Sequence, residues 1–97
     1  MPAYLIVDVD LKDMDAYRES GYLTAVPEIA AKHGGRYIVR GGELVQLEGS
    51  WMPKRLVIVE FPDMESLQAF HSSEEYAPYL AIRNQLATSH AIAVQGL

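Results

Sequence analysis

The sequence predicts a ferredoxin-like α+β fold, in which a four-stranded antiparallel sheet carries its helices on one face. Strand and helix patterns alternate in the order β-α-β-β-α-β over the whole chain. The 97 residues are enough for one small domain with its own core, so residues 1–97 are expected to form a single domain. Hydrophobic residues make up 49% of the chain and charged residues 22%, which is ordinary for a globular protein and excludes a disordered one.

The first third of the chain predicts a strand followed by an interrupted helix. Residues 4–9 are apolar and β-branched, as in a strand. Asp13 is a typical N-cap residue, and an apolar stripe at helical spacing follows it. The pair Ser20-Gly21 weakens this helix, and Pro27 removes one of its backbone hydrogen bonds. We therefore expect a kink, or a break into two helices, between Ser20 and Pro27.

Two strands joined by a long connection are predicted in the middle of the chain. Residues 36–40 predict the second strand, and the pair Gly41-Gly42 marks a bulge or a turn after it. Residues 43–47 then continue in extended form. Residues 55–61 are the clearest strand of the chain, since every residue from 56 to 61 except Glu60 is apolar.

The last third of the chain predicts two short helical pieces and a final strand. Asp63 is placed to cap the first piece. Ser72 and Glu75 have the spacing of a capping box, which predicts that a second piece begins there. Apolar residues and Arg83 share one face of that piece, and residues 90–94 predict the last strand.

Both faces of the predicted sheet are apolar, which predicts a homodimer. Ile6 and Ile58 lie on one face, whereas Val7 and Val57 lie on the other. Helices cover one face only, so a monomer would expose an apolar patch on the order of several hundred Å². Packing against the open face of a second copy would bury it. The alternative is that the segment 36–48 folds back over the open face.

Short motifs similar to those of one known family occur in order along nearly the whole chain. They are the opening Ala-Tyr-Leu-Ile-Val-Asp-Val, Gly34-Gly35-Arg36-Tyr37, Arg40-Gly41-Gly42, Glu48-Gly49-Ser50-Trp51, Pro53-Lys54-Arg55, Glu60-Phe61-Pro62 and Ser73-Glu74-Glu75-Tyr76. With these motifs the chain resembles the bacterial family known as domain of unknown function 1330. The resemblance implies a ferredoxin-like fold of the dimeric α-β barrel superfamily, in which two sheets pack face to face.

The resemblance leaves the activity open. The superfamily that it implies includes cofactor-free monooxygenases, haem-degrading enzymes, isomerases and many members with no known activity. The family brings no established catalytic residues, so no role is carried over to a residue of this sequence.

Arg83 is the most informative candidate for a functional site. It lies seven residues after Tyr76 on the inward face of its predicted helix, and a buried guanidinium needs an acceptor. We expect that acceptor to be Asp8 or Glu60, at the ends of the first and third strands, which we predict to be adjacent and parallel. One interpretation is a pocket in which Arg83 and Tyr76 bind an anionic ligand and Glu60 is the base. The other, more common one is a buried ion pair that holds the helix on the sheet.

Three further residues are candidates for a site. His71, on the apolar side of its short helix, has the chemistry of a general acid or base, although a histidine at the edge of a core is more common. Arg40, with Arg55, could attract an anionic small molecule, but we prefer a solvated strand edge that discourages aggregation. Trp51 lies in a turn, where it would pack against the protein or close a pocket at a dimer rim.

The sequence also excludes several classes of function. It has no cysteine, hence no disulfide and no cysteine nucleophile, and its three histidines are not spaced as metal ligands, so neither a metal nor another cofactor is expected. A net charge of −5 argues against a nucleic-acid partner. No segment is long and apolar enough for a membrane, and a cytoplasmic location is expected. The remaining functions are a cofactor-free enzyme acting on a small anionic or aromatic metabolite, a non-catalytic binding module, or a structural dimer.

Overall fold

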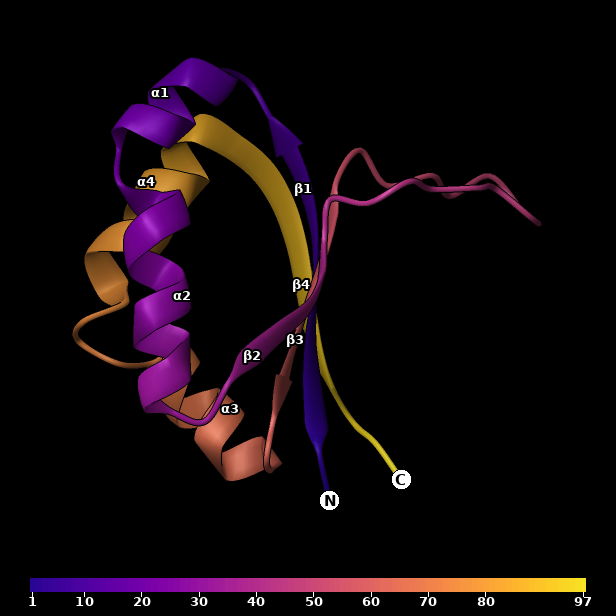
Figure 1. The fold of residues 1–97 in the computed structure, drawn as a ribbon. Helices are drawn as coiled ribbons and strands as arrows, with labels where there is room; N and C mark the ends of the chain where they lie inside the picture. Colours follow the sequence, from indigo (N-terminus) through magenta and orange to yellow (C-terminus); the bar gives the residue numbers. More distant parts are fainter.

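A four-stranded antiparallel sheet forms the centre of the computed structural model, which covers residues 1–97. Its strands, in the spatial order β2-β3-β1-β4, are β1 (Ala3–Leu11), β2 (Arg36–Arg40), β3 (Leu56–Phe61) and β4 (Ala87–Gln95). The helices are α1 (Met14–Glu19), α2 (Tyr22–Lys32), α3 (Met64–His71) and α4 (Ala77–Leu86). All of them lie on one side of the sheet, and the other side is open (Figure 1). The fold is the predicted ferredoxin-like α+β fold. None of the helices is both long and apolar enough to span a bilayer.

The predicted break in the first helix occurs at Gly21. This residue has φ +84°, a left-handed conformation that a residue with a side chain rarely adopts, and it separates α1 from α2. Pro27 lies inside α2 and does not end it. The predicted caps are also present, because the side chain of Asp13 accepts the backbone N–H of Ala16 at 3.1 Å. Asp63 caps α3 in the same way.

Two predictions about the C-terminal third are wrong. Ser72 does not cap the last helix: it ends α3, and the oxygen of Ser73 accepts the backbone N–H of Tyr76 at 3.2 Å. The last strand begins at Ala87 and not at residue 90. Its nine residues pair with the nine of β1, from Leu11↔Ala87 at one end. Pairing with a long neighbouring strand extends β4 beyond what its own residues indicate.

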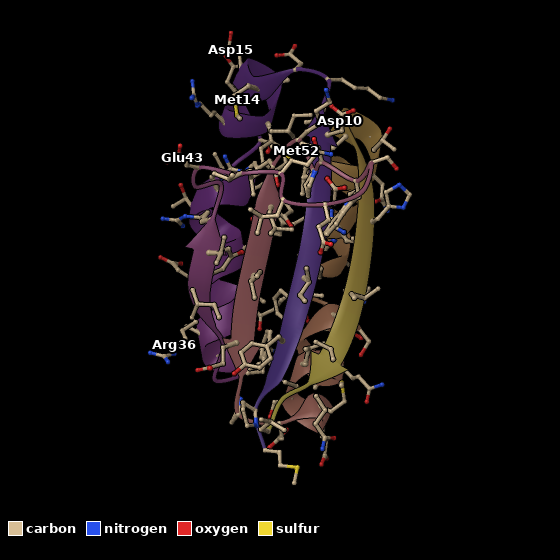
Figure 2. All side chains as sticks on the ribbon, turned by 90° about the vertical axis from the view of Figure 1, so that its right-hand side faces the viewer. Asp10, Met14, Asp15, Arg36, Glu43 and Met52 are labelled. Atoms are coloured by element: carbon tan, nitrogen blue, oxygen red, sulfur yellow. The ribbon has the colours of Figure 1, made fainter.

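The predicted parallel pairing of the two central strands is also wrong. β1 and β3 are antiparallel, with Tyr4 opposite Glu60 and Asp8 opposite Leu56. The crossover through α1 and α2 brings β2 back parallel to β1, and β3 then returns between them in the opposite direction. Asp8 and Glu60 therefore lie at opposite ends of the sheet. Figure 2 looks onto the open face, where Asp10, two residues after Asp8, and Arg36, which pairs with Glu60, lie at opposite ends.

A β-bulge lies within β2, earlier than the glycine pair that predicted one. The register shifts between Tyr37 and Val39, so Arg36 is opposite Glu60 on the open face whereas Arg40 is opposite Val57 on the helix side. Without the bulge, residues 36 and 40 would share a face, because side chains alternate along a strand. The bulge thus turns Arg40 towards the helices.

The segment 41–55 forms an arm that projects from the open side of the sheet (Figure 1). It contains no helix or strand, and Val45 and Leu47 are 70% and 88% exposed. The alternative in which this part of the chain covers the open face is wrong, since Ile92 and Val94 remain exposed there.

The hydrophobic core lies between the helices and the sheet. Three aromatic side chains are stacked in it: the ring centres of Phe61 and Phe70 are 5.4 Å apart, and those of Phe70 and Tyr76 are 4.5 Å apart. All three are at most 2% exposed. This stack joins β3, α3 and the start of α4, and so fixes the position of the helix that carries Arg83.

Candidate functional site

Arg83 is buried beneath the helices, and no carboxylate binds it. Its side chain is on α4, and the residue is only 6% exposed. Its Nη1 donates to the hydroxyl of Tyr76 at 3.2 Å and to that of Tyr22 at 3.4 Å. The two hydroxyls share a hydrogen bond of 2.8 Å, and the Nε of Arg83 has no partner. The predicted ion pair with Asp8 or Glu60 is therefore wrong.

Local structure brings these three side chains together. Tyr76 and Arg83 are seven residues apart, about two helical turns, so they lie on the same face of α4 and the turn before it. Tyr22 is the first residue of α2, directly after the break at Gly21. The break therefore starts a new helix at the position that directs the hydroxyl of Tyr22 to Arg83.

Arg83 faces a cavity of about 40 Å³ between the sheet and the helices. Most of the cavity wall is apolar or aromatic, and it contains three arginines and no acidic residue. The lining residues are Leu5, Val7, Val9, Tyr17, Tyr22, Leu23, Val26, Pro27, Tyr37, Arg40, Arg55, Val57, Val59, Phe70, Tyr76 and Arg83. Since a water molecule needs roughly 10–15 Å³ of such volume, the cavity has room for a few waters or one small anionic group.

The electrostatics of the cavity leave the charge of Arg83 without a counterion. Burial raises the pKa of Tyr76 and of Tyr17 far above the usual range, and it raises the pKa of Tyr37 to about 12. These side chains are therefore neutral hydroxyls near pH 7. Burial lowers the pKa of Arg83, but the oxygens of Tyr22 and Tyr76 outweigh this effect, so the pKa is raised and the guanidinium is charged.

Two more arginines line the outer part of the cavity. The guanidinium carbon of Arg40 lies 5.4 Å from the centre of the Tyr37 ring, as in a cation–π contact. Arg55 packs against Gly41, where a Cβ atom would come within 2.8 Å of its Nη1. Gly41 thus leaves the space that the Arg55 side chain occupies. Arg40 is exposed and Arg55 half-buried, so these two side chains mark the mouth of the cavity and Arg83 its inner end.

Four of the predicted site residues lie outside the cavity. Glu60 binds the Nε of Arg36 at 2.8 Å on the open face, and Asp8 accepts the indole N–H of Trp51 at 3.3 Å. His71 is exposed on α3, where it lines a groove against β4, and its ring centre is 5.9 Å from that of Tyr76. Burial, together with the charge of Arg83, lowers the pKa of His71.

Arg83, Tyr76 and Arg40 are the predicted residues that the structure brings together. Sequence reasoning missed Tyr22 as a polar partner, although the helix break at Gly21 was a signal for it. It also preferred a solvated strand edge for Arg40 and Arg55, because residue spacing shows neither that the bulge lies between Tyr37 and Val39 nor that Arg55 packs against Gly41. No group of three His, Asp or Glu side chains is close enough to hold a metal ion.

Residues 2–97 match the model of a family described as a domain of unknown function, DUF1330. The chain belongs to this family. The match covers nearly the whole chain and confirms the resemblance that its short motifs indicated. The observed order of strands and helices agrees with the ferredoxin-like fold that this resemblance implied. No curated protein matches the sequence.

Several solved structures share the fold of this DUF1330 chain. A protein of unknown function from Rhodopseudomonas palustris is 19% identical, with a TM-score of 0.76, over 99% of this chain and 82% of that one. SnoaB, a cofactor-independent oxygenase from Streptomyces nogalater, is 13% identical, with a TM-score of 0.71, over 99% and 93% of the two chains. Rv0793 from Mycobacterium tuberculosis is 19% identical, with a TM-score of 0.63, over 100% and 96%. At these identities the likeness shows the fold alone.

Proposed function

We propose that this chain binds a small organic acid or enol, one with an apolar body, through its oxygen at Arg83. The observation that carries the proposal is the buried guanidinium whose Nε has no partner and whose only acceptors are two tyrosine hydroxyls. A carboxylate or an enolate would supply the missing acceptor through a charge-assisted hydrogen bond.

The energetics favour a ligand over a purely structural role for Arg83. An uncompensated buried charge costs several kcal/mol, on the order of what one or two core side chains contribute. Tyrosine hydroxyls reduce this cost but do not neutralise the charge. A packed apolar side chain at position 83 would serve stability equally well, so the arginine is best explained by an anion that binds there.

A second candidate function is cofactor-free oxygenation of such a ligand. The charge of Arg83 would stabilise an enolate or phenolate, the electron-rich form that reacts with oxygen, inside a largely apolar cavity. The shared fold with SnoaB, a cofactor-independent oxygenase, supports this candidate. His71, in a groove between α3 and β4, and Glu60, on the open face, lie outside the cavity and are not part of this proposal.

The functional unit in this proposal is a homodimer formed through the open face of the sheet. Ile38, Ile92 and Val94 are 45%, 63% and 43% exposed there. The arm adds further exposed apolar side chains, Val45, Leu47, Trp51 and Met52. Burying such surface contributes roughly 25 cal/mol per Å² before the cost of association. A second copy presents the same surface and would cover it.

A cytoplasmic location and the lack of a nucleic-acid partner stay predictions from the sequence.

Titration calorimetry with benzoate and hexanoate as probes tests the binding site. We expect both to bind the wild-type protein and to lose binding in Arg83→Met, which removes the charge and keeps most of the volume. Arg18→Met is the matched control, because Arg18 is an exposed arginine of α1 outside the cavity. Equal binding by wild type and Arg83→Met would reject the proposed site.

Oxygen uptake in the presence of hydroquinone, an easily oxidised phenol, tests the second candidate. Uptake above the rate without protein, and absent in Arg83→Met, is the result expected of an oxygenase. Binding of the acids without any oxygen uptake would leave binding as the function.

Light scattering tests the assembly, and the mass of a single chain at micromolar concentration would reject the dimer.

A further inference from the structure

The two arginines at the mouth of the cavity have no anionic partner within the chain. Arg40 and Arg55 take part in none of the ion pairs, which join Arg18 to Asp15, Lys32 to Glu75 and Arg36 to Glu60. The chain has 13 acidic residues and a net charge of −5, yet none of those 13 lines the cavity. Positive charge is therefore concentrated here against the overall charge of the protein.

Two backbone features place these arginines at the mouth. The bulge between Tyr37 and Val39 puts Arg40 opposite Val57, on the helix side, where a regular strand would have left it with Arg36 on the open face. Gly41, with φ +70°, leaves room for the guanidinium of Arg55, which a Cβ atom would contact. Bulges that redirect a side chain are often found beside functional sites.

We propose that the ligand carries a second anionic group, which binds between Arg40 and Arg55 while the first binds Arg83. This inference rests on the proposed function and specifies its ligand class: an apolar-bodied diacid, or an acid that bears an enol at its other end. The apolar wall between the inner end and the mouth, formed by side chains such as Val57, Val59 and Val7, would contact the body of the ligand. The cavity of about 40 Å³ would enclose only the first oxyanion and the part of the body next to it, so the rest of the ligand would lie in the open mouth.

Matched pairs of probes that differ only in the second charge test this inference. Hexanoate is compared with adipate, and heptanoate with pimelate, in titrations of the wild-type protein. We expect at least one diacid to bind about tenfold more tightly than the monoacid of the same length, as one partly solvated charge pair allows. Added salt should weaken the diacid more than the monoacid, because the mouth is exposed to solvent.

The double variant Arg40→Met/Arg55→Met separates the inference from the proposed function. It should bring adipate or pimelate down to the affinity of the monoacid and weaken the monoacid far less than the diacid, whereas Arg83→Met should abolish binding of both. Arg18→Met controls for the loss of a surface charge. If monoacids bind through Arg83 but no diacid binds more tightly, this inference is overturned and the proposed function stands. If no acid binds at all, both are overturned.

Discussion

The two faces of the sheet carry similar apolar side chains but differ in what covers them. On the helix side, Val59 is 2% exposed, and Arg83 is the one charged residue that is buried. On the open side, Ile92 is 63% exposed, and the charged residues lie towards the ends of the strands, as in the Arg36–Glu60 pair. The helix side therefore accounts for folding of the single chain. Folding of the single chain does not explain the buried charge on the helix side or the exposed apolar surface on the open side. We propose that a ligand binds the buried charge and that a second copy of the chain covers the apolar surface.

The largest effect should come from removing a core side chain on the helix side. Phe61→Ala is expected to lower the free energy of unfolding by about 3–5 kcal/mol, because it leaves a cavity beside Phe70. Ile92→Ala, on the open face, is expected to lower the free energy of unfolding of the single chain by less than about 1 kcal/mol, because this side chain is 63% exposed there. Urea denaturation at a protein concentration below the dissociation constant of the dimer measures both. Equal losses would contradict the distinction between the two faces.

A charge introduced on the open face should break the dimer and leave the fold intact. Ile58→Asp puts a carboxylate opposite Ile6 in the centre of that face, twice in a symmetric dimer. We expect the dissociation constant of the dimer to rise at least about a hundredfold, or roughly 3 kcal/mol. Sedimentation or light scattering over a dilution series measures it, with circular dichroism to show that the chain stays folded. Ala81→Asp, on the exposed side of α4, is the control and should not change the mass.

Replacement of Arg83 should separate stability from binding. Arg83→Met removes a buried charge that has no carboxylate partner, so the free energy of unfolding without ligand should stay the same or rise by about 1 kcal/mol. Arg83→Ala should lower it instead, because it leaves a void. A loss of about 3 kcal/mol or more in Arg83→Met would show that the Arg83–Tyr22–Tyr76 group is structural.

The smallest effect should be a dependence of stability on pH through His71. Burial, then the charge of Arg83, lowers its pKa in the folded protein, so the unfolded chain binds this proton more tightly. The free energy of unfolding should therefore fall as the pH drops below the ordinary histidine value of about 6.5. The side chain is largely exposed, which keeps the effect small. His71→Gln should flatten this part of the profile, and an unchanged profile would assign the dependence to other groups.

Sequence patterns predicted the fold well because local signals and global topology agree. Asp13 and Asp63 cap helices, Gly21 breaks one, and runs of apolar residues mark β1 and β3. The candidate site was predicted in part. Arg83 was recognised because a cation on an apolar helix face conflicts with the pattern around it, and Tyr76 because it shares that face. The predicted acceptors of Arg83 were wrong, because the prediction depended on the relative direction of β1 and β3, which no local sequence pattern indicates.

The amino-acid sequence by itself determined the strands, the helices, the burial of Arg83 and the apolar character of both sheet faces, since each follows from residue type and spacing. The tertiary structure alone decided what lies beside what. Antiparallel pairing placed Asp8 and Glu60 at opposite ends of the open face, and one extra residue in β2 turned Arg40 to the helix side. Spacing along the chain fixes which face a side chain occupies only while the register is regular. Strand direction and bulges are set by contacts between segments far apart in the sequence, and these contacts place three arginines around one cavity.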